Sequence, residues 1–273
     1  MGTQHDGLVG DRITVTYGRN IAVNEVSIEV SRHQIVGLIG PNGAGKTSFI
    51  DAVTGFTPMT NGRVLLDDHD ITALSAHRRA ARGLRRTFQQ LRLFDDLTVR
   101  ENLVVAAEND TKFGMLRDLI RPRRTEIATD RTLELTGLLD VADELPRDLP
   151  SGTRRVVGVA RAIVADPTTL LLDEPAAGLD TQETAELGAM LERVAESGVG
   201  LLLIEHDTDL VFRICHHVVA LDFGHVIASG AADSVRRSDE LISAYLGIAD
   251  EAETAGPETD GPVPAGQEPD GPA

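Results

Sequence analysis

The sequence predicts an α/β fold, in which a mainly parallel sheet with flanking helices has an antiparallel β edge and an inserted α-helical subdomain. Short apolar runs that are typical of strands alternate with helical segments along most of the chain. In the middle, a stretch without strands is typical of helices separated by prolines. Because strands that alternate with helices usually pair in parallel, these observations indicate a parallel sheet that is interrupted by a helical insertion.

The first part of the chain is expected to place strands around a glycine-rich turn. Two strands alternate apolar and polar residues, as edge strands do, and a third is a short apolar run that leads into the glycines. A helix should follow from about Gly45. The expected strands cover residues 13–17, 22–30, 34–39 and 63–66, the last after the turn residues Asn61 and Gly62, and a short helix covers residues 76–82.

The rest of the chain is expected to form the helical insertion, the second half of the sheet and a tail. The expected helices cover residues 98–108, 125–136 and 181–197, with breaks at Pro122, Pro146 and Pro150, and the expected strands cover residues 169–172, 200–204, 218–221 and 225–228. We therefore predict a single domain at about residues 10–247, with a core at 10–88 and 165–247 and a helical subdomain at 89–164. Residues 248–273 are acidic and rich in Pro and Gly, which predicts a disordered tail.

Composition limits the class of protein. The 273 residues are 41% hydrophobic, which suffices for one large domain with a sizeable core. No run approaches the roughly 18 apolar residues of a membrane span, and residues 1–10 lack the pattern of a secretory signal. We expect a folded, soluble protein in the cytosol. Cys215 is the only cysteine, which excludes an internal disulfide and a cysteine-based zinc site and favours a packing role.

The charge distribution argues against nucleic acid as a partner. The formal net charge is -17, and part of the acidic excess lies in the final segment, which has no Lys or Arg. Affinity for nucleic acid depends mainly on cationic contacts to phosphate, so a broad DNA- or RNA-binding face is not expected. A cluster of arginines could form a local basic patch, but a solvated helix face is the commoner interpretation. The cluster consists of Arg78, Arg79, Arg82, Arg85 and Arg86.

A phosphate-binding motif follows the third expected strand. Residues 40–47 fit the pattern G-x-x-x-x-G-K-[ST], and a helix is expected directly after them. Such a loop brings backbone N–H groups and a helix N-terminus close to phosphates. Lys46 should reach the β- and γ-phosphates of ATP, and Thr47 should ligate Mg²⁺. An ordinary glycine-rich turn is the alternative. The expected nucleotide-binding residues are Gly40, Pro41, Asn42, Gly43, Ala44, Gly45, Lys46, Thr47 and Ser48, in a P-loop NTPase core.

Two acids end the apolar run at residues 169–172. Asp173 would lie at the sheet edge, where it could hold Mg²⁺ beside the phosphates. Glu174 would then lie near the attacking water, and a carboxylate there can take the proton of that water as a general base. Asp-Glu after a strand is more often a helix N-terminal cap, but the phosphate loop favours the functional interpretation.

A second apolar strand, at residues 201–204, ends in Glu205, His206 and Asp207. His206 could contact the γ-phosphate and hold the water and Glu174 in place. A lone histidine after a strand is more often structural. The position of His206, one helix and one strand beyond Glu174, favours the catalytic role.

These motifs and several others, in this order, resemble the ABC ATPase family across nearly all of residues 10–247. Tyr17 stands where that family stacks a ring on adenine, although an aromatic packed in the core is as good an interpretation. Phe88 and Gln89 are similar to the glutamine loop, which implies that Gln89 senses Mg²⁺ and the attacking water as a catalytic and metal-site residue. His206 is similar to the switch histidine, and Asp180, in Pro175 to Asp180, would bridge to a second subunit.

The family signature Leu-Ser-Gly-Gly-Gln is altered in this chain. Its place is taken by residues 149–153, where Pro150 removes a hydroxyl, Thr153 replaces the glutamine and Gly152 is kept. Ser151 could supply a substitute hydroxyl. The resemblance implies that two such domains face each other, and that each ATP lies between the phosphate loop of one and the signature of the other, so Ser151 and Gly152 would contact a nucleotide.

Further motifs resemble the importers of branched-chain amino acids and the related urea or amide importers. They include residues 86–89, 92–94, 97–103, 173–179 and 204–207. That branch often relaxes the signature. The resemblance implies a second ABC ATPase subunit, different or identical, together with integral membrane permease subunits and, indirectly, an extracytoplasmic solute-binding protein. The chain would then lie at the cytoplasmic face of the cell membrane.

Two other functions remain open at this point. An ABC ATPase that acts in DNA repair or translation is disfavoured by the single nucleotide-binding unit, the acidic body and the absence of a coiled-coil insertion. A regulatory module that binds ATP without hydrolysing it is motivated by the altered signature. The transported solute is not encoded in this chain, because other subunits would select it.

Overall fold

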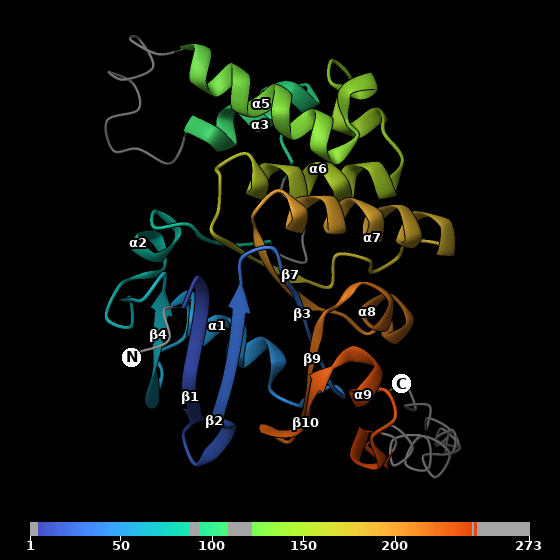
Figure 1. Ribbon diagram of the computed structural model, residues 1–273. Helices are drawn as coiled ribbons and strands as arrows, with labels where there is room; N and C mark the ends of the chain where they lie inside the picture. The colour runs from blue at the N-terminus through green and yellow to red at the C-terminus, as the bar shows by residue number, and fades with distance from the viewer. Residues whose placement is uncertain (1–4, 88–92, 109–121, 242, 245–273) are drawn as a thin grey trace, which may run out of the picture.

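The computed structural model describes residues 5–87, 93–108, 122–241 and 243–244 (Figure 1). The expected tail and the Phe88-Gln89 segment lie outside these residues. The strands are β1 (Gly7–Tyr17), β2 (Asn20–Ser31), β3 (Ile35–Ile39), β4 (Asn61–Leu66), β5 (His69–Asp70), β6 (Leu84–Arg86), β7 (Thr169–Asp173), β8 (Gly200–Ile204), β9 (His217–Asp222) and β10 (His225–Ala231). The helices are α1 (Lys46–Thr54), α2 (Ala76–Ala80), α3 (Val99–Glu108), α5 (Pro122–Thr136), α6 (Ser151–Ile163), α7 (Thr181–Glu196), α8 (Thr208–Ile214) and α9 (Ala232–Val235), with 3-10 turns at Leu139–Val141 and Pro146–Asp148.

The larger sheet has six strands in the order β10-β9-β3-β8-β7-β6. All its neighbouring pairs are parallel except β9 and β10, which form an antiparallel edge. Every residue of β3, β7 and β8 is buried. Strands covered on both faces need apolar side chains at every position, which explains why these three are continuous apolar runs. Their carboxyl ends lie together, since Asp173 is opposite Ile204 across the β7–β8 ladder.

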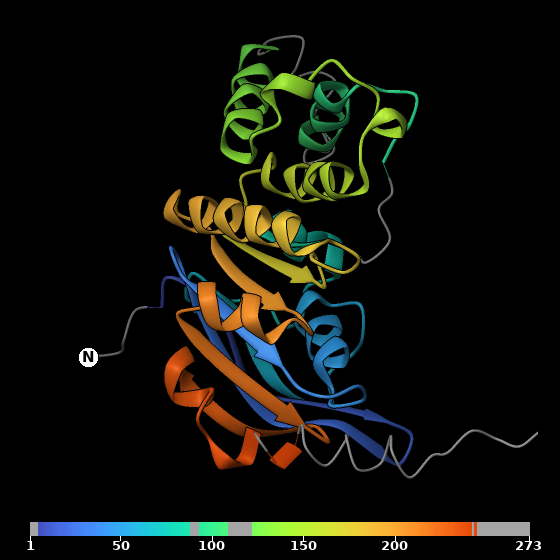
Figure 2. The ribbon, with the colours of Figure 1, turned by 90° about the vertical axis from the view of Figure 1, so that its right-hand side faces the viewer.

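The first face of this sheet is covered by α1 and by the smaller antiparallel sheet, whose order is β2-β1-β4-β5. Phe49, Ile50 and Val53 of α1 pack in one core with residues from both sheets. The helix that follows the phosphate loop is therefore held between two sheets (Figure 2).

The opposite face is covered by α7 and α8. Alternate side chains of the central strands, such as Leu170 and Leu172 of β7, join Leu187 and Leu191 of α7 in a second core. Their neighbour Leu171 points into the first core. This period of two is the expected consequence of the pleat. The buried Cys215 belongs to the second core, and burial raises the pKa of its thiol to about 12, which agrees with a packing role.

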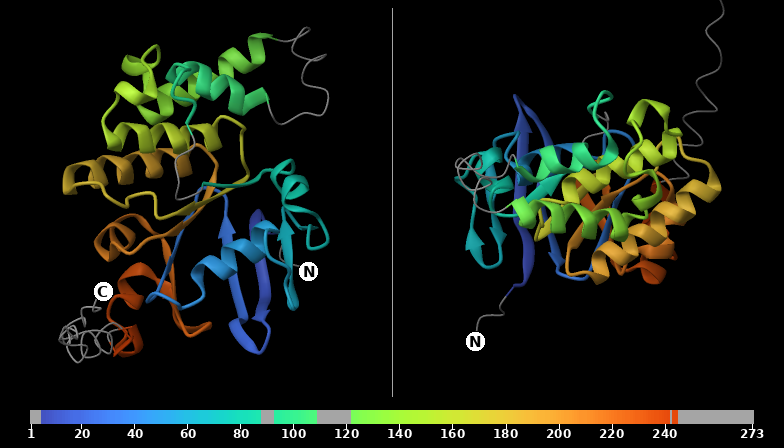
Figure 3. Two further views of the ribbon diagram at one scale, coloured as in Figure 1. Left: turned by 180° about the vertical axis from the view of Figure 1, so that it is seen from behind. Right: turned by 90° about the horizontal axis from the view of Figure 1, so that it is seen from above.

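The helices α3, α5 and α6 gather at one end of the molecule, beyond α7 (Figure 3). They share a third core that includes Val99 of α3, Leu133 of α5 and Val157 of α6. Val159 and Ile163 on another side of α6 belong to the second core, so α6 connects the helical part to the sheet. None of the described helices is long and apolar enough to cross a membrane.

The predicted fold class is confirmed, and most expected elements are present within a few residues. The domain boundaries remain predictions. The short elements β5, β6, α8 and α9 were not anticipated. Placing the arginine cluster on a solvated helix face was wrong for three of its members. Arg79 is 3% exposed, and Arg85 and Arg86 lie on strand β6, where the Arg86 side chain is 8% exposed. Arg79 donates hydrogen bonds to four backbone carbonyls, among them Ala52 and Val53 at the C-terminal end of α1.

Candidate functional site

The phosphate loop has a backbone that only glycine adopts easily. Gly40, Gly43 and Gly45 have φ values of 146°, 84° and 103°. A Cβ on Gly40 would lie 2.1 Å from the Leu221 carbonyl oxygen, and a Cβ on Gly45 would lie 2.3 Å from the Ala22 carbonyl oxygen. At Gly43 a Cβ would meet nothing within 4 Å, so this part of the loop faces open space. The glycines of the motif are therefore required by backbone geometry and by close packing.

The loop leads directly into helix α1. Gly45 occupies the N-cap position and makes no side-chain capping bond. Early N–H groups of a helix lack intrahelical partners, and together with the helix dipole they favour an anion. The expected residues Thr47 and Ser48 lie in this first turn, and Thr47 is exposed. The end of α1 can thus bind phosphate as the motif predicts.

Lys46 lies inside the loop. Its side chain is 6% exposed, and Nζ donates to the carbonyl oxygens of Gly40 at 2.7 Å and Pro41 at 2.9 Å. Burial lowers the pKa of Lys46, and the nearby carboxylates of Glu174 and Asp173 oppose this shift. Because β3 and β7 both pair with β8 in parallel, with Leu38 and Asp173 opposite Ile204, the phosphate loop after β3 and the two acids at the end of β7 lie at the same edge of the sheet.

Asp173 ends β7 and is 4% exposed. Its Oδ2 accepts a hydrogen bond from Arg86 Nη2 at 2.7 Å, and Arg86 also contacts Asp51 of α1. Its Oδ1 is buried and has no hydrogen-bond partner in the part of the chain that the structure describes. A buried carboxylate oxygen without a donor is unfavourable unless a cation uses it. Asp173 therefore fits the predicted Mg²⁺ ligand and does not cap a helix.

Metal binding at this edge would depend on the nucleotide. Among the described residues no group of three or more His, Cys, Asp or Glu side chains could hold a metal ion by itself. Mg²⁺ at phosphate sites is commonly held by one or two protein ligands together with phosphate oxygens. Asp173 and Thr47 match that arrangement.

Glu174 and His206 are in direct contact. His206 Nε2 lies 2.9 Å from Glu174 Oε1, and since an ionised carboxylate can only accept, the histidine nitrogen is the donor. Glu174 has a φ of 51°, which is uncommon for a residue with a side chain. Its backbone is held on both sides, because its N–H donates to the Ile204 carbonyl at 2.9 Å and its carbonyl accepts from Arg155 Nη1 at 3.2 Å. Strained backbone of this kind is concentrated at functional sites.

Two predicted residues on the nucleotide side are less constrained by the structure. Tyr17 ends β1 and is 50% exposed, so the alternative of a ring packed in the core was wrong. Stacking of Tyr17 on adenine stays a prediction. Gln89 lies outside the described residues, but Thr87 precedes it closely and its hydroxyl accepts from the Asp173 N–H at 3.4 Å.

The altered signature begins helix α6. Pro150 is the N-cap residue and Ser151, which is exposed, is the first helical residue. Gly152 is buried, and a Cβ there would lie 2.3 Å from Glu183 Oε1 of α7. Asp180 caps α7, where its side chain accepts from the Glu183 N–H at 2.8 Å in a reciprocal capping box. The signature glycine and the Asp180 loop are therefore packed against each other through Glu183.

Sequence reasoning missed three residues that support the site, namely Arg86, Arg155 and Glu205. Arg86 was assigned to a solvated cluster, and Arg155 is one of several arginines on α6. Glu205 stands directly before His206 at the end of a buried strand, and it is 3% exposed. A charged residue that continues an apolar run is the only signal that could have drawn attention to it.

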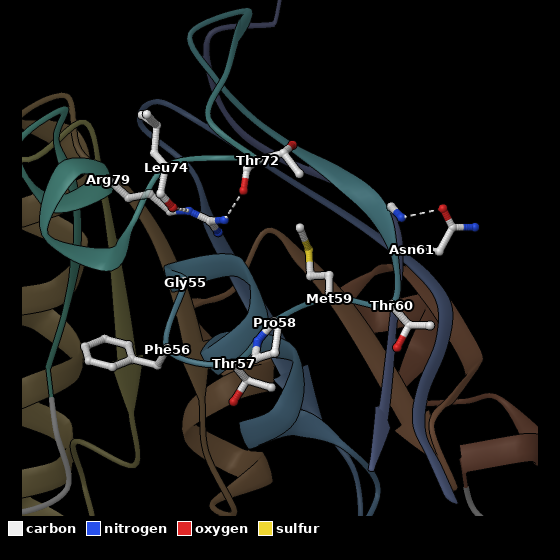
Figure 4. Close-up of a pocket in the computed structure, with 11 residues that line it drawn as sticks. Gly55, Phe56, Thr57, Pro58, Met59, Thr60, Asn61, Thr72, Leu74 and Arg79 are labelled. Atoms are coloured by element: carbon white, nitrogen blue, oxygen red, sulfur yellow. Dashed lines mark hydrogen bonds between the residues drawn. The ribbon is translucent and has the colours of Figure 1, made fainter. Parts of the chain in front are cut away.

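A separate pocket of about 530 Å³ lies at the opposite end of α1 from the phosphate loop (Figure 4). Its lining includes Phe56, Met59 and Asn61, and Arg79 lies on the α2 side with bonds to the Thr72 and Leu74 carbonyls. None of the residues predicted to bind nucleotide lines it, so this pocket and the candidate site are distinct.

Comparison with known proteins agrees with the geometry. The ABC transporter family matches residues 23–177, which include the phosphate loop and Glu174. The chain is 39% identical over 245 residues to the high-affinity branched-chain amino acid transport ATP-binding protein LivG of Escherichia coli K12, with 87% of this chain and 96% of that protein covered. It is 38% identical, with the same coverage, to BraF of Pseudomonas aeruginosa, which has the same description. The lipopolysaccharide export system ATP-binding protein LptB of Haemophilus influenzae is 33% identical, with 88% of this chain and 97% of that protein covered.

Among solved structures, the ADP conformation of MJ1267, an ATP-binding cassette of an ABC transporter, has a TM-score of 0.77 at 27% identity, with 89% of this chain and 99% of that chain covered.

Proposed function

This chain belongs to the ABC transporter family as an ATP-binding subunit that hydrolyses ATP, and on that premise we propose that it energises the uptake of branched-chain amino acids. The observation that carries this proposal is the identity of 38–39% to LivG and BraF, which extends over 87% of the chain. The identity to LptB is lower, at 33% over a similar share of the chain, which favours amino-acid uptake over lipopolysaccharide export.

The proposed chemistry is attack of water on the γ-phosphorus of ATP. Glu174 takes a proton from the water as the new P–O bond forms, and the bond between the γ-phosphorus and the β–γ bridging oxygen breaks to release ADP. The Glu174–His206 contact of 2.9 Å supports this assignment, because it orients the carboxylate. Lys46 neutralises charge on the β- and γ-phosphates, and the loop from Gly40 to Thr47 wraps around them. Tyr17 would stack on the adenine ring.

Mg²⁺ is the proposed second cofactor. Asp173 Oδ1 and the Thr47 hydroxyl would hold it together with phosphate oxygens, and Gln89 would sense it from the neighbouring segment. When bound, the ion neutralises phosphate charge. The Arg86 contact supports this role of Asp173, since it fixes Oδ2 and leaves Oδ1 for the cation.

A second ABC ATPase subunit is proposed to complete each site. The start of α6, with Ser151 and Gly152, would face the nucleotide of that subunit, and Asp180 would lie at the interface. Pro150 supports a heterodimer. It lacks the hydroxyl of the usual signature, so this chain's signature would bind the nucleotide of the partner subunit less well than an unaltered signature would. A homodimer is the alternative.

The remaining proposed partners lie in and beyond the membrane. ABC ATP-binding subunits work with membrane permease subunits, and we propose that this one sits at the cytoplasmic face of the cell membrane against such permeases. An extracytoplasmic solute-binding protein would deliver the amino acid. We propose no nucleic-acid partner, since the net charge of -17 opposes contact with phosphate backbones.

The catalytic assignment is tested with Glu174→Gln. The variant is expected to bind ATP with near-normal affinity and to lose turnover, because the amide cannot accept the proton of water. ATP hydrolysis and retention of labelled ATP are measured on the full chain assembled with its partner subunits. Turnover at the wild-type rate would refute the general-base role of Glu174.

The transport assignment needs a separate measurement. The chain is purified with its membrane and solute-binding subunits, and ATP-dependent uptake of labelled leucine, isoleucine and valine into vesicles is compared with uptake of urea. Uptake of the amino acids that is lost in Glu174→Gln supports the proposal. Uptake of urea alone would favour the related urea or amide importers. Stable association with ribosomes or DNA, without permeases, would instead indicate a role outside transport.

A further inference from the structure

Glu205 is a buried carboxylate for which the proposed reaction has no use. It follows strand β8 and is 3% exposed. Burial raises its pKa, since removal from water disfavours the charged form. Since none of the proposed catalytic steps uses this side chain, its own contacts must explain why a buried carboxylate is kept there.

Both oxygens of Glu205 accept hydrogen bonds from backbone amides. Oε1 accepts from the Ala176 N–H at 2.5 Å, and Oε2 accepts from the His206 N–H at 3.2 Å. Ala176 lies two residues after Glu174, in the loop that follows β7. The side chain therefore connects the loop that carries the general base to the loop that carries the histidine.

Two further bonds join the same loops. The Glu174 N–H donates to the Ile204 carbonyl at 2.9 Å, and the Glu174 and His206 side chains meet at 2.9 Å. The backbone bond fixes where the first loop leaves the sheet. The two bonds of Glu205 fix the positions of Ala176 and of the His206 backbone, and the side-chain contact between Glu174 and His206 depends on both.

Accepting from both the Ala176 N–H and the His206 N–H requires two acceptor oxygens at the end of a side chain as long as that of glutamate. Glutamine has the same shape but presents one acceptor oxygen, and its NH₂ group would face one of the two amide N–H groups. An apolar side chain would leave both N–H groups without their partner. The contact pattern thus explains why a glutamate, despite its burial, occupies the position.

We propose that Glu205 is a positioning residue for ATP hydrolysis, which sets the geometry of Glu174 and His206 by holding the two loops together. It acts through these residues and does not touch the nucleotide. The proposal rests on the proposed catalytic roles of Glu174 and His206.

The test compares Glu205→Gln with wild type in the full-length chain assembled with its partner subunits. The kcat for ATP is expected to fall on the order of tenfold or more, because small misplacements of catalytic groups have large effects on rate. The KM is expected to stay within about twofold, since the phosphate loop is unchanged. Thr136→Val is the matched control, as it removes one buried hydrogen bond, from Thr136 Oγ1 to the Thr132 carbonyl, in helix α5. The control should lower thermal stability without lowering kcat.

A double-mutant cycle with His206→Ala separates positioning from a general loss of stability. Single-turnover rates with excess protein are measured for both single variants and the double variant. Glu205→Gln should lower the single-turnover rate much less in the His206→Ala background, because the side chain that Glu205 positions is already missing there. Equal effects in both backgrounds, or an unchanged kcat in Glu205→Gln, would overturn the proposal. Glu174→Gln is assayed alongside. Retained turnover in Glu174→Gln would contradict the catalytic assignment. If Glu174→Gln lost turnover while Glu205→Gln kept a normal kcat, only the positioning role of Glu205 would be contradicted.

Discussion

Arg86 donates from Nη2 to Asp173 Oδ2 over 2.7 Å, and the two side chains are only 8% and 3% exposed. Arg86 also contacts Asp51 of α1, so one guanidinium joins three elements, namely β6, β7 and the helix that follows the phosphate loop. A buried charge that loses its partner is strongly destabilising, because the remaining charge stays desolvated.

Arg86→Met should therefore lower the free energy of unfolding by about 3 kcal/mol or more. The control is Arg63→Met, which breaks the exposed pair of Arg63 and Asp11 at 2.8 Å. Surface pairs of this kind contribute at most about 1 kcal/mol. Urea unfolding of both variants measures the difference. Equal losses in the two variants would contradict the structural role of the Arg86–Asp173 pair.

The lowered pKa of Lys46 should make ATP affinity and folding stability change in opposite directions as the pH rises. Its pKa is lowered, mainly by burial, so the ammonium is lost at a lower pH than in an ordinary lysine. ATP affinity, which needs the charge, should fall as the pH rises through this lowered pKa. In the unfolded chain Lys46 keeps its proton up to the ordinary pKa, so between the two values the contribution of Lys46 to folding stability should rise with pH, as the difference from Lys46→Arg measures.

Binding of a fluorescent ATP analogue and urea unfolding are followed from pH 8 to 10.5 to test this. Lys46→Arg keeps its charge throughout, because the guanidinium does not deprotonate in this range. The alkaline loss of affinity should therefore be absent in Lys46→Arg. An identical pH profile for both proteins would show that another group is responsible.

We expect substitutions at Gly152, at the start of α6, and at Glu183, in the capping box of α7, to have coupled effects on stability. A Cβ at this position would lie 2.3 Å from Glu183 Oε1, while Oε2 of the same side chain accepts from the Asp180 N–H at 3.1 Å. Gly152→Ala should displace Glu183 and remove half of the capping box, which costs about 1 kcal/mol. In a Glu183→Ala background the same substitution should cost much less. Additive losses, measured by thermal unfolding, would contradict this coupling.

Sequence patterns could predict those residues of the site that directly follow an apolar strand. The apolar strands β3, β7 and β8 deliver the phosphate loop, Asp173 and His206, and each could be recognised from a run of consecutive residues. Arg86 could not, because its three-residue strand has no periodicity and its assignment depends on partners far away in the chain. The roles of Arg155 and Glu205 likewise depend on backbone groups of another loop, which only tertiary packing brings near.

Arg155 provides the most direct test of whether α6 influences catalysis. Its Nη1 donates to the Glu174 carbonyl at 3.2 Å, and Glu174 has the uncommon φ of 51°. Since a hydrogen bond to a charged group contributes about 1.5 kcal/mol or more, Arg155→Met should let this backbone relax and lower the kcat for ATP by roughly tenfold. The KM should change little, because Arg155 does not contact the phosphate loop.

The neighbouring Arg154 is the matched control on the same helix. It donates to the Pro146 carbonyl and to Asp95, both at 3.1–3.2 Å, and not to Glu174. Arg154→Met should therefore keep the wild-type kcat, and Arg155→Lys should retain part of it, because an ammonium can still donate to the Glu174 carbonyl. Steady-state ATP hydrolysis distinguishes the variants. If Arg154→Met and Arg155→Met lowered kcat equally, the effect would come from the charge of α6 and not from the bond to Glu174.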